Sequence, residues 1–253
     1  MEEIEKLRAA EDNNYVATRA QIGDSASLVE DLVSLYGLLG ALVKDSGVPP
    51  RDEVVAASQF LLACRYQLTM GALIALRGHL NDSFYFSRKA IELCAFAARV
   101  KNHPHLAMIW LQAWHNAASY DKFREKFSPG KLFPEDHTLL GALYERYDHC
   151  SKMVHPSVSS LGGHIEVTQG NSVFEFKFNY FQLKEDDASE PIRTILWTVD
   201  THFGILRVFE EVLADVIAYD PARWNVRRNA VDAKIAVHKS RWLPILKVNT
   251  KGE

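Results

Sequence analysis

Over the first 155 residues, apolar side chains recur at the three- and four-residue spacing of an α-helix. The clearest run comprises Leu28, Leu32, Leu35, Leu39 and Leu42, and its spacing of 4, 3, 4 and 3 places all five leucines on one helical face. Such a stripe needs a partner to bury it, so several helices must pack their apolar faces together. At 47% hydrophobic residues, the chain has ample material for a core. The sequence therefore predicts a mainly α fold.

Glycine and proline divide this pattern into a bundle of about six or seven helices. Helices are expected to stop at Gly47-Val48-Pro49-Pro50, before Pro104 and at Pro156, because the residue before a proline disfavours the helical conformation. The expected helices are Glu3–Ile22 (a weak pattern), Ser25–Lys44 with Ser25 or Ser27 as its cap, Arg51–Arg77, Ser83–Asn102, His105–Phe127, Glu135–Val154, Pro191–Tyr219 and, outside the bundle, Pro221–Arg241.

The period then changes near residues 164–180. Ile165–Thr168 and Val173–Phe178 alternate with a period of two, and Gln169-Gly170-Asn171 between them has the composition of a turn. This pattern predicts one small β-hairpin. Its three phenylalanines, Phe174, Phe176 and Phe178, share one face, which we expect to pack against the helices.

Charge separates the last 33 residues from the rest. Residues 1–60 hold 5 Lys/Arg and 11 Asp/Glu, whereas residues 221–253 hold 8 and 2. We therefore expect a helical bundle with a hairpin insertion over 1–220 and a basic C-terminal helix and tail over 221–253. The basic segment could bind RNA phosphates. The candidate residues are Arg223, Arg227, Arg228, Lys239 and Arg241.

The alternative for the basic segment is contact with the acidic N-terminal part, within one chain or across a dimer. Trp224 and Trp242 favour this alternative, because tryptophan prefers burial. A homo-oligomer or a partner protein is the corresponding expectation.

We expect a cytoplasmic protein that does not enter a membrane. The first residues form neither a basic nor an apolar leader. The most apolar stretch, Val54–Leu76, carries Arg65, which is costly inside a bilayer. Three widely spaced cysteines, Cys64, Cys94 and Cys150, indicate neither a disulfide framework nor a zinc ribbon.

Two stripes run along the expected helix Glu135–Val154 and its end. Leu140, Leu143, Tyr147, Cys150 and Val154 form the face expected to point into the core. A polar stripe about 100° away is formed by Tyr144, Asp148, Ser151 and His155. This second stripe suits the wall of a cleft. In the other interpretation these side chains face water, and His155 bonds the last carbonyls of the helix.

The expected helix Ser83–Asn102 is apolar over most of its surface and should be central in the bundle. It nevertheless carries Arg88 and Glu92, four residues apart. A charge on a buried helix is costly unless it is paired. The two side chains either satisfy each other or present a guanidinium to a cleft.

The order of parts resembles the helical bundles of the HEPN superfamily. The resemblance rests on Leu76-Arg77-Gly78, Ser87-Arg88-Lys89-Ala90-Ile91-Glu92, Leu143-Tyr144 and Ser151-Lys152-Met153-Val154-His155-Pro156. It implies a protein that binds RNA or cleaves it, in defence or stress response. Nuclease members of this superfamily use an Arg and a His, four to six residues apart, for metal-independent RNA cleavage, whereas others only bind.

The chain departs from that motif. Arg146 lies too far from His155 and too close to His149 to match the spacing. If the protein is a ribonuclease, we expect His155 to be the acid–base group and Arg88 to stabilise the charge developing on phosphorus.

Two other classes of function remain open. The first is a non-catalytic interaction or dimerisation module. The second is a bundle metalloenzyme, for which Glu145 and His149 share a helical face. No second helix offers a matching Glu-x-x-His set, and we therefore expect no metal and no cofactor.

Overall fold

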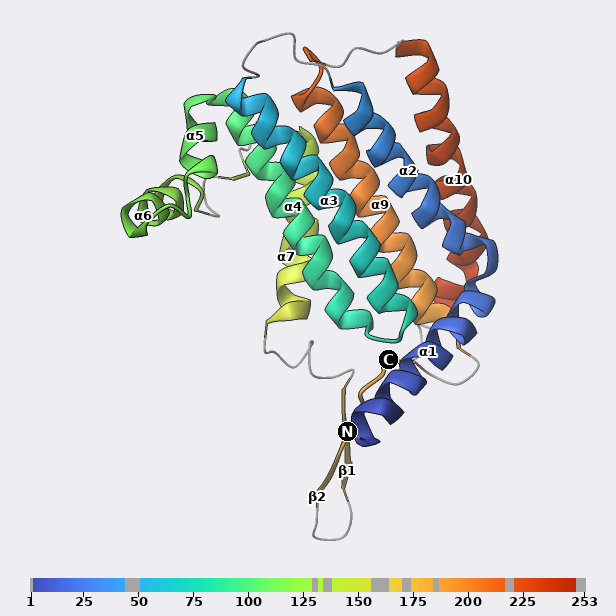
Figure 1. The fold of residues 1–253 in the computed structure, drawn as a ribbon. Helices are drawn as coiled ribbons and strands as arrows, with labels where there is room; N and C mark the ends of the chain where they lie inside the picture. The colour runs from blue at the N-terminus through green and yellow to red at the C-terminus, as the bar shows by residue number, and fades with distance from the viewer. Residues whose placement is uncertain are drawn as a thin grey trace.

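In a computed structural model, the chain is a bundle of long helices with two appendages, a helical pair and a hairpin (Figure 1). The structure describes residues 2–43, 51–128, 132–133, 138–155, 164–169, 174–183, 187–216 and 221–248. The elements are α1 (Glu2–Ile22), the 3-10 helix η1 (Gly23–Ala26), α2 (Ser27–Leu42), α3 (Asp52–Leu76), α4 (Leu80–Asn102), α5 (His105–Leu111), α6 (Ala117–Lys126), α7 (Thr138–Val154), β1 (Ile165–Gln169), β2 (Phe174–Phe178), α9 (Ser189–Val212) and α10 (Pro221–Val248). The predicted fold class, mainly α with one small hairpin, is confirmed.

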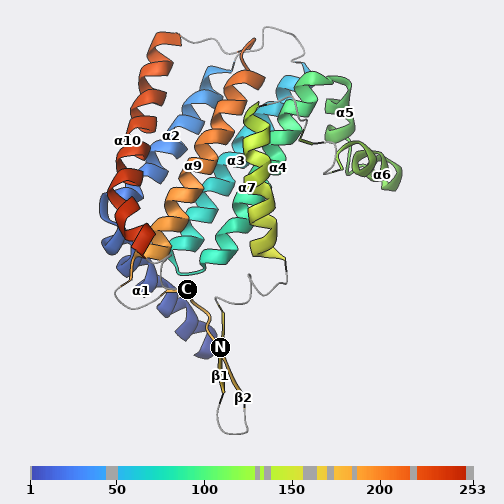
Figure 2. The ribbon, with the colours of Figure 1, turned by 180° about the vertical axis from the view of Figure 1, so that it is seen from behind.

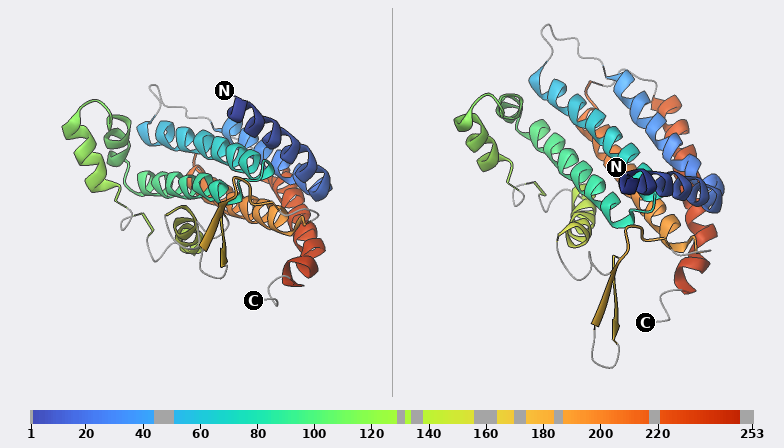
Figure 3. Two further views of the ribbon diagram at one scale, coloured as in Figure 1. Left: turned by 90° about the horizontal axis from the view of Figure 1, so that it is seen from below. Right: turned by 60° about the horizontal axis from the view of Figure 1, so that its bottom comes forward.

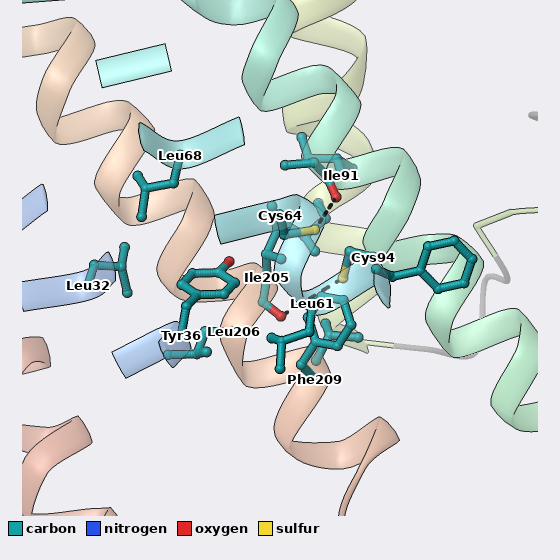
Figure 4. Packing of buried hydrophobic residues seen from close by; sticks show 14 of the residues in the cluster. Leu32, Tyr36, Leu61, Cys64, Leu68, Ile91, Cys94, Ile205, Leu206 and Phe209 are labelled. Atoms are coloured by element: carbon teal, nitrogen blue, oxygen red, sulfur yellow. Dashed lines mark hydrogen bonds between the residues drawn. The ribbon is translucent and has the colours of Figure 1, made fainter. Parts of the chain in front are cut away.

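The core lies where α3, α4 and α9 meet, and α2 and α7 close it from either side (Figures 1 and 2). Figure 4 shows its centre, where Tyr36 of α2 and Phe209 of α9 pack against leucines of α3. The thiol of Cys64 donates to the carbonyl of Ala90 at 3.3 Å. Cys94 is also fully buried. As predicted, α4 is central and all three cysteines are free thiols.

Two helix boundaries differ from the expectation because local turns divide or join the periodic segments. The segment His105–Phe127 is two helices, α5 and α6, separated by residues 112–116. The side chain of Asn116 accepts a hydrogen bond from the Ser119 backbone N–H and starts α6. Conversely, η1 joins α1 to α2, so neither Ser25 nor Ser27 caps α2, and Ser27 is its first residue.

The predicted turn after α3 is tighter than expected, and α4 begins at Leu80 instead of Ser83. Gly78 has φ +97°, a conformation that favours glycine. A Cβ at this position would lie 3.0 Å from the side chain of Leu183. The Gln182 N–H donates to the Gly78 carbonyl at 2.8 Å, and this contact fastens the chain after the hairpin to the end of the bundle.

The hairpin forms as predicted, but it extends beyond the ends of the helices (Figures 1 and 3). Its strands pair with Ile165 opposite Phe178. The expectation that Phe178 packs against the helices is wrong: its side chain is 56% exposed and stacks on His164 of the same hairpin. Strand alternation fixes which residues share a face, but it does not fix what that face meets. The side chains of Phe174 and Phe176 lie outside the described residues.

Helix α10 packs along α2 and α9 rather than standing apart (Figure 2). Trp224 is buried, and its indole N–H donates to Glu210 of α9. Glu210 also accepts from Arg228 at 3.0 Å and contacts Arg207 at 2.7 Å. Removing a carboxylate from water costs free energy, and the three partners of Glu210 offset that cost.

Two stretches, Glu2–Leu42 and Asp52–Leu76, are long and apolar enough to cross a membrane by length and composition. Both contribute buried residues to the bundle, among them Leu32 and Phe60. Core helices of soluble proteins have the same composition, so this property is weak evidence for a membrane span.

We expect Trp224→Ala to lower the free energy of unfolding by about 3–5 kcal/mol, because the change removes a buried ring and one partner of Glu210. Urea denaturation followed by circular dichroism measures this cost. Arg223→Ala, one residue away on the exposed side of α10, is the matched control and should cost less than about 0.5 kcal/mol. An equal, small effect of both substitutions would show that α10 does not stabilise the bundle.

His202 should make the fold sensitive to acid. Its ring is fully buried, and neither ring nitrogen has a hydrogen-bond partner among the described residues. Burial lowers the pKa of His202 to about 3, against about 6.5 in an unfolded chain. Between these values the unfolded chain binds a proton that the folded chain does not. The free energy of unfolding should therefore fall as the pH falls, by up to roughly 1.4 kcal/mol per pH unit.

The measurement is the urea midpoint at pH 7, 6 and 5 for the wild type and His202→Leu. We expect the substitution to reduce the loss of stability between pH 6 and 5, whereas His103→Gln, at an exposed position, should leave it unchanged. An undiminished loss in His202→Leu would contradict this assignment.

Candidate functional site

Helix α7 presents its two predicted faces as expected. Leu140, Leu143 and Cys150 are buried, and Tyr147 and Val154 pack at the edge of the core. Burial raises the pKa of the Cys150 thiol to about 12, so this thiol stays protonated. Helices α4 and α9 both contact α7, which forms one side of the bundle (Figure 2). The exposed edge of α7 is therefore framed by α4 on one side and α9 on the other.

On the α4 side, Arg88 and Glu92 meet at Tyr147. The Arg88 guanidinium donates to the Tyr147 hydroxyl at 3.1 Å and lies 5.1 Å from the ring centroid. The same hydroxyl donates to Glu92 at 3.3 Å, and the Arg88 Nε lies 3.6 Å from the carboxylate. Burial acts to lower the pKa of Arg88, but the hydrogen bond to Tyr147 and the charge of Glu92 raise it overall. Arg88 and Glu92 thus largely satisfy each other through Tyr147.

The polar stripe does not converge on a common point. Tyr144 is 52% exposed and stacks on Tyr147. Asp148 pairs with Lys152 at 2.6 Å on the surface, and the Ser151 hydroxyl donates to the Tyr147 carbonyl at 2.8 Å. These contacts are local to α7 and leave Ser151 without a base in the described structure.

His155 and Arg88 lie apart. His155 follows the end of α7, exposed to solvent, and its backbone N–H donates to the Ser151 carbonyl at 3.1 Å. Tyr147, the partner of Arg88, precedes His155 by eight residues. At about 1.5 Å per residue, this separation is about 12 Å along the helix. The structure brings Arg88 and Glu92 together at Tyr147, and the helical rise places His155 about 12 Å further along the chain from that tyrosine.

On the α9 side, an ion network that the sequence did not reveal joins three helices. Arg146 of α7 donates to Asp200 of α9 at 2.5 Å and to the Thr201 hydroxyl at 2.7 Å. Lys239 of α10 donates to the same carboxylate at 3.0 Å. Burial alone would raise the pKa of Asp200, but its hydrogen bonds to Arg146 and Lys239 lower it overall.

His149 lies one turn from Arg146, against two aromatic rings. Its ring centroid is 5.3 Å from that of Phe84 on α4 and 5.6 Å from that of Trp197 on α9. The Arg146 guanidinium lies 5.8 Å from the centroid of the same tryptophan. Burial and the charge of Lys152 lower the pKa of His149, although Asp148 opposes the shift. An exposed imidazole and a guanidinium therefore both contact the ring of Trp197, and the neutral imidazole can accept a proton.

The spacing of Arg146 and His149 was visible in the sequence, because residues three apart share a helical face. Comparison with the HEPN motif set the pair aside. Trp197, Asp200 and Lys239 could not be associated with it from sequence, since they come from two other helices.

The predicted RNA-binding residues of α10 divide into two groups. Arg241 pairs with Asp24 at 2.5 Å, Lys239 with Asp200, and Arg228 with Glu210, so these three charges are compensated. Lys234 likewise pairs with Asp31 at 2.6 Å. The alternative of contact with the acidic N-terminal part within one chain is thus observed for Lys234 and Arg241. Arg223 and Arg227 are exposed, four residues apart, and form no ion pair within the described residues.

A small pocket of about 150 Å³ lies at the end of the bundle near α5, between α3, α4 and residues 212–216. Its charged groups are already paired, because Arg51 and Lys101 both bind Asp215. Among the residues that the structure describes, no three His, Cys, Asp or Glu side chains gather as metal ligands would.

No protein-family model matches the chain, and comparisons with curated proteins and with solved structures find no match either.

Proposed function

We propose that the chain binds RNA along the exposed edge of α7, with His149 as the acid–base group if the RNA is cleaved. One observation carries the proposal: His149 and Arg146 both lie against the ring of Trp197, and the lowered pKa of His149 keeps this exposed imidazole neutral near pH 7. Groups with a shifted pKa beside a charged partner are frequent at functional sites.

The chemistry of the pair suits an RNA backbone. A neutral imidazole can take the proton of a ribose 2′-hydroxyl, and a guanidinium offers forked donors to a phosphate. Asp200 holds Arg146 in the described structure, so a phosphate would compete with this carboxylate for the guanidinium. The resemblance to the HEPN superfamily supports RNA as the ligand, but the three-residue spacing of Arg146 and His149 is shorter than that of the nuclease motif. Arg88 and His155 remain the sequence-based alternative.

The decisive measurement is binding and cleavage of a fluorescent RNA by the wild type, His149→Gln and Arg146→Lys. Loss of a general base should slow cleavage by about 100-fold or more in His149→Gln. Because burial lowers the pKa of His149, the wild-type rate should begin to decrease at a lower pH than it would with an ordinary histidine as the base. Arg146→Lys keeps the charge but loses the fork, and should weaken both properties.

His155→Gln and His103→Gln are the matched controls, since both histidines are exposed as His149 is. An effect of His155→Gln with none of His149→Gln would favour the sequence-based site. Absence of RNA binding by the wild type would refute the proposed function.

The second candidate function, a self-associating interaction module, is favoured by the hairpin. Val167, Phe178 and Tyr180 are each 56–57% exposed, although two are strongly apolar. A two-stranded hairpin is at best marginally stable on its own in water. Contact with a second copy would bury these side chains and complete the sheet.

Light scattering tests this alternative. If the hairpin mediates a dimer, Phe178→Ser with Tyr180→Ser should give a monomer, whereas the dimer of the wild type should persist at 1 M salt because the contact is apolar. Tyr85→Ser, at a tyrosine 54% exposed on α4, is the control. A monomeric wild type at all protein concentrations would rule this alternative out.

A further inference from the structure

An aromatic surface lies on α6 and on the turn that joins it to α5, at the side of the bundle (Figure 1). Trp114, in the turn between these helices, is 79% exposed, the highest exposure among the large hydrophobic side chains of the described residues. Its ring lies 5.0 Å from that of Tyr120, with 31° between the two planes. Exposing a tryptophan to this extent gives up a large favourable free energy of burial. A binding partner that covers the ring would recover it.

The two rings are the outer end of a ladder that begins in the core. Successive centroid distances are 6.0 Å from Phe60 to Phe96, 5.1 Å to Phe127, 5.2 Å to Phe123 and 6.2 Å to Tyr120. Phe60 is fully buried and Phe127 is 5% exposed. The outer rings are nearly parallel, with 28–31° between neighbours. The exposed ring of Trp114 therefore continues a series of packed aromatic side chains that extends into the core.

The end of α6 is fixed to the bundle as well. Arg99 of α4 donates to the carbonyl of Lys126 at 3.1 Å and satisfies one of the last carbonyls of the helix. Asn116 holds its first turn. Tyr120 is thus carried on a short helix whose N-terminus is capped and whose C-terminal end is bound to α4, and Trp114 lies in the turn just before this helix.

Positive charge accompanies the rings. The guanidinium of Arg124 lies 5.9 Å from the centroid of Tyr120, one turn along α6, and is exposed. Helix α6 carries Lys122, Arg124 and Lys126 against Asp121 and Glu125, a net charge of +1. Lys126 pairs with Glu125 at 2.7 Å. Arg124 is the cation of α6 that contacts one of these rings.

We propose that Trp114, Tyr120 and Arg124 form a platform on which unpaired RNA bases stack, while Arg124 contacts a phosphate. This inference rests on the proposed RNA binding and adds a second contact site at α6. An exposed aromatic face binds any base through its π-system, and a neighbouring arginine adds attraction to the backbone. Bases within a duplex are already stacked, so the platform selects single strands.

The experiment measures the affinity of the full-length protein for a 12-nucleotide single-stranded RNA that contains 2-aminopurine, and for its duplex. We expect Trp114→Ala with Tyr120→Ala to weaken single-strand binding by roughly ten-fold or more and to abolish the change in 2-aminopurine fluorescence. Trp114→Phe should retain most of the affinity, because it keeps a ring. Arg124→Ala should make the salt dependence shallower by about 0.7 in the logarithmic slope.

Tyr66→Ala with Tyr85→Ala removes two other exposed tyrosines and serves as the matched control. Circular dichroism of every variant checks folding, and light scattering of the platform variant checks oligomeric state.

The outcomes separate this site from the proposed function. Single-strand binding that is unchanged in the platform variant overturns the platform and leaves RNA binding intact. No binding of either RNA by the wild type overturns both. Duplex binding as tight as single-strand binding, or a platform variant altered only in its oligomeric state, assigns the surface to another partner and also overturns the platform.

Discussion

Burial of α4 on most of its circumference is the constraint on which the rest of the structure depends. Its apolar residues extend beyond one narrow stripe, so a single partner helix could not cover them. Helices α3, α7 and α9 therefore surround it, and the site on α7 follows from this packing. Cys64 and Cys94 act here as small hydrophobic groups whose thiols meet backbone carbonyls across helix contacts.

Most positive charges of α10 form ion pairs within the chain and are therefore not free to bind a ligand. Lys234, Lys239 and Arg241 are each paired with a carboxylate on another element. Exposed pairs of this kind contribute little individually to stability, so the buried Trp224 and its contact with Glu210 hold the helix more firmly. The same pairing reduces the positive charge available to RNA phosphates. Arg223 and Arg227, which form no ion pair within the described residues, and Arg124 of α6 remain available for such contacts.

The two candidate binding surfaces of this protein differ in character. Around Trp197, half-buried Arg146 and exposed His149 contact the same ring, and the surroundings lower the pKa of His149. Around Trp114, the decisive feature is an exposed flat surface with a rigid support. The first could bind or act on a backbone, and the second could hold bases. Under the proposed function, the two surfaces would together bind RNA without a large basic face on a chain of net charge −3.

The sequence by itself determined the helical class, the hairpin and the faces of α7, because the spacing of apolar residues is a local property that a helix or strand must obey. It also placed Arg88 and Glu92 on one stripe. Only the tertiary structure decided that Arg88 meets Tyr147, that His149 and Arg146 meet Trp197, and that Phe178 faces solvent. Periodicity tells which side chains share a face of one element. The partner across that face depends on how helices distant in sequence pack, and no spacing within one helix records it.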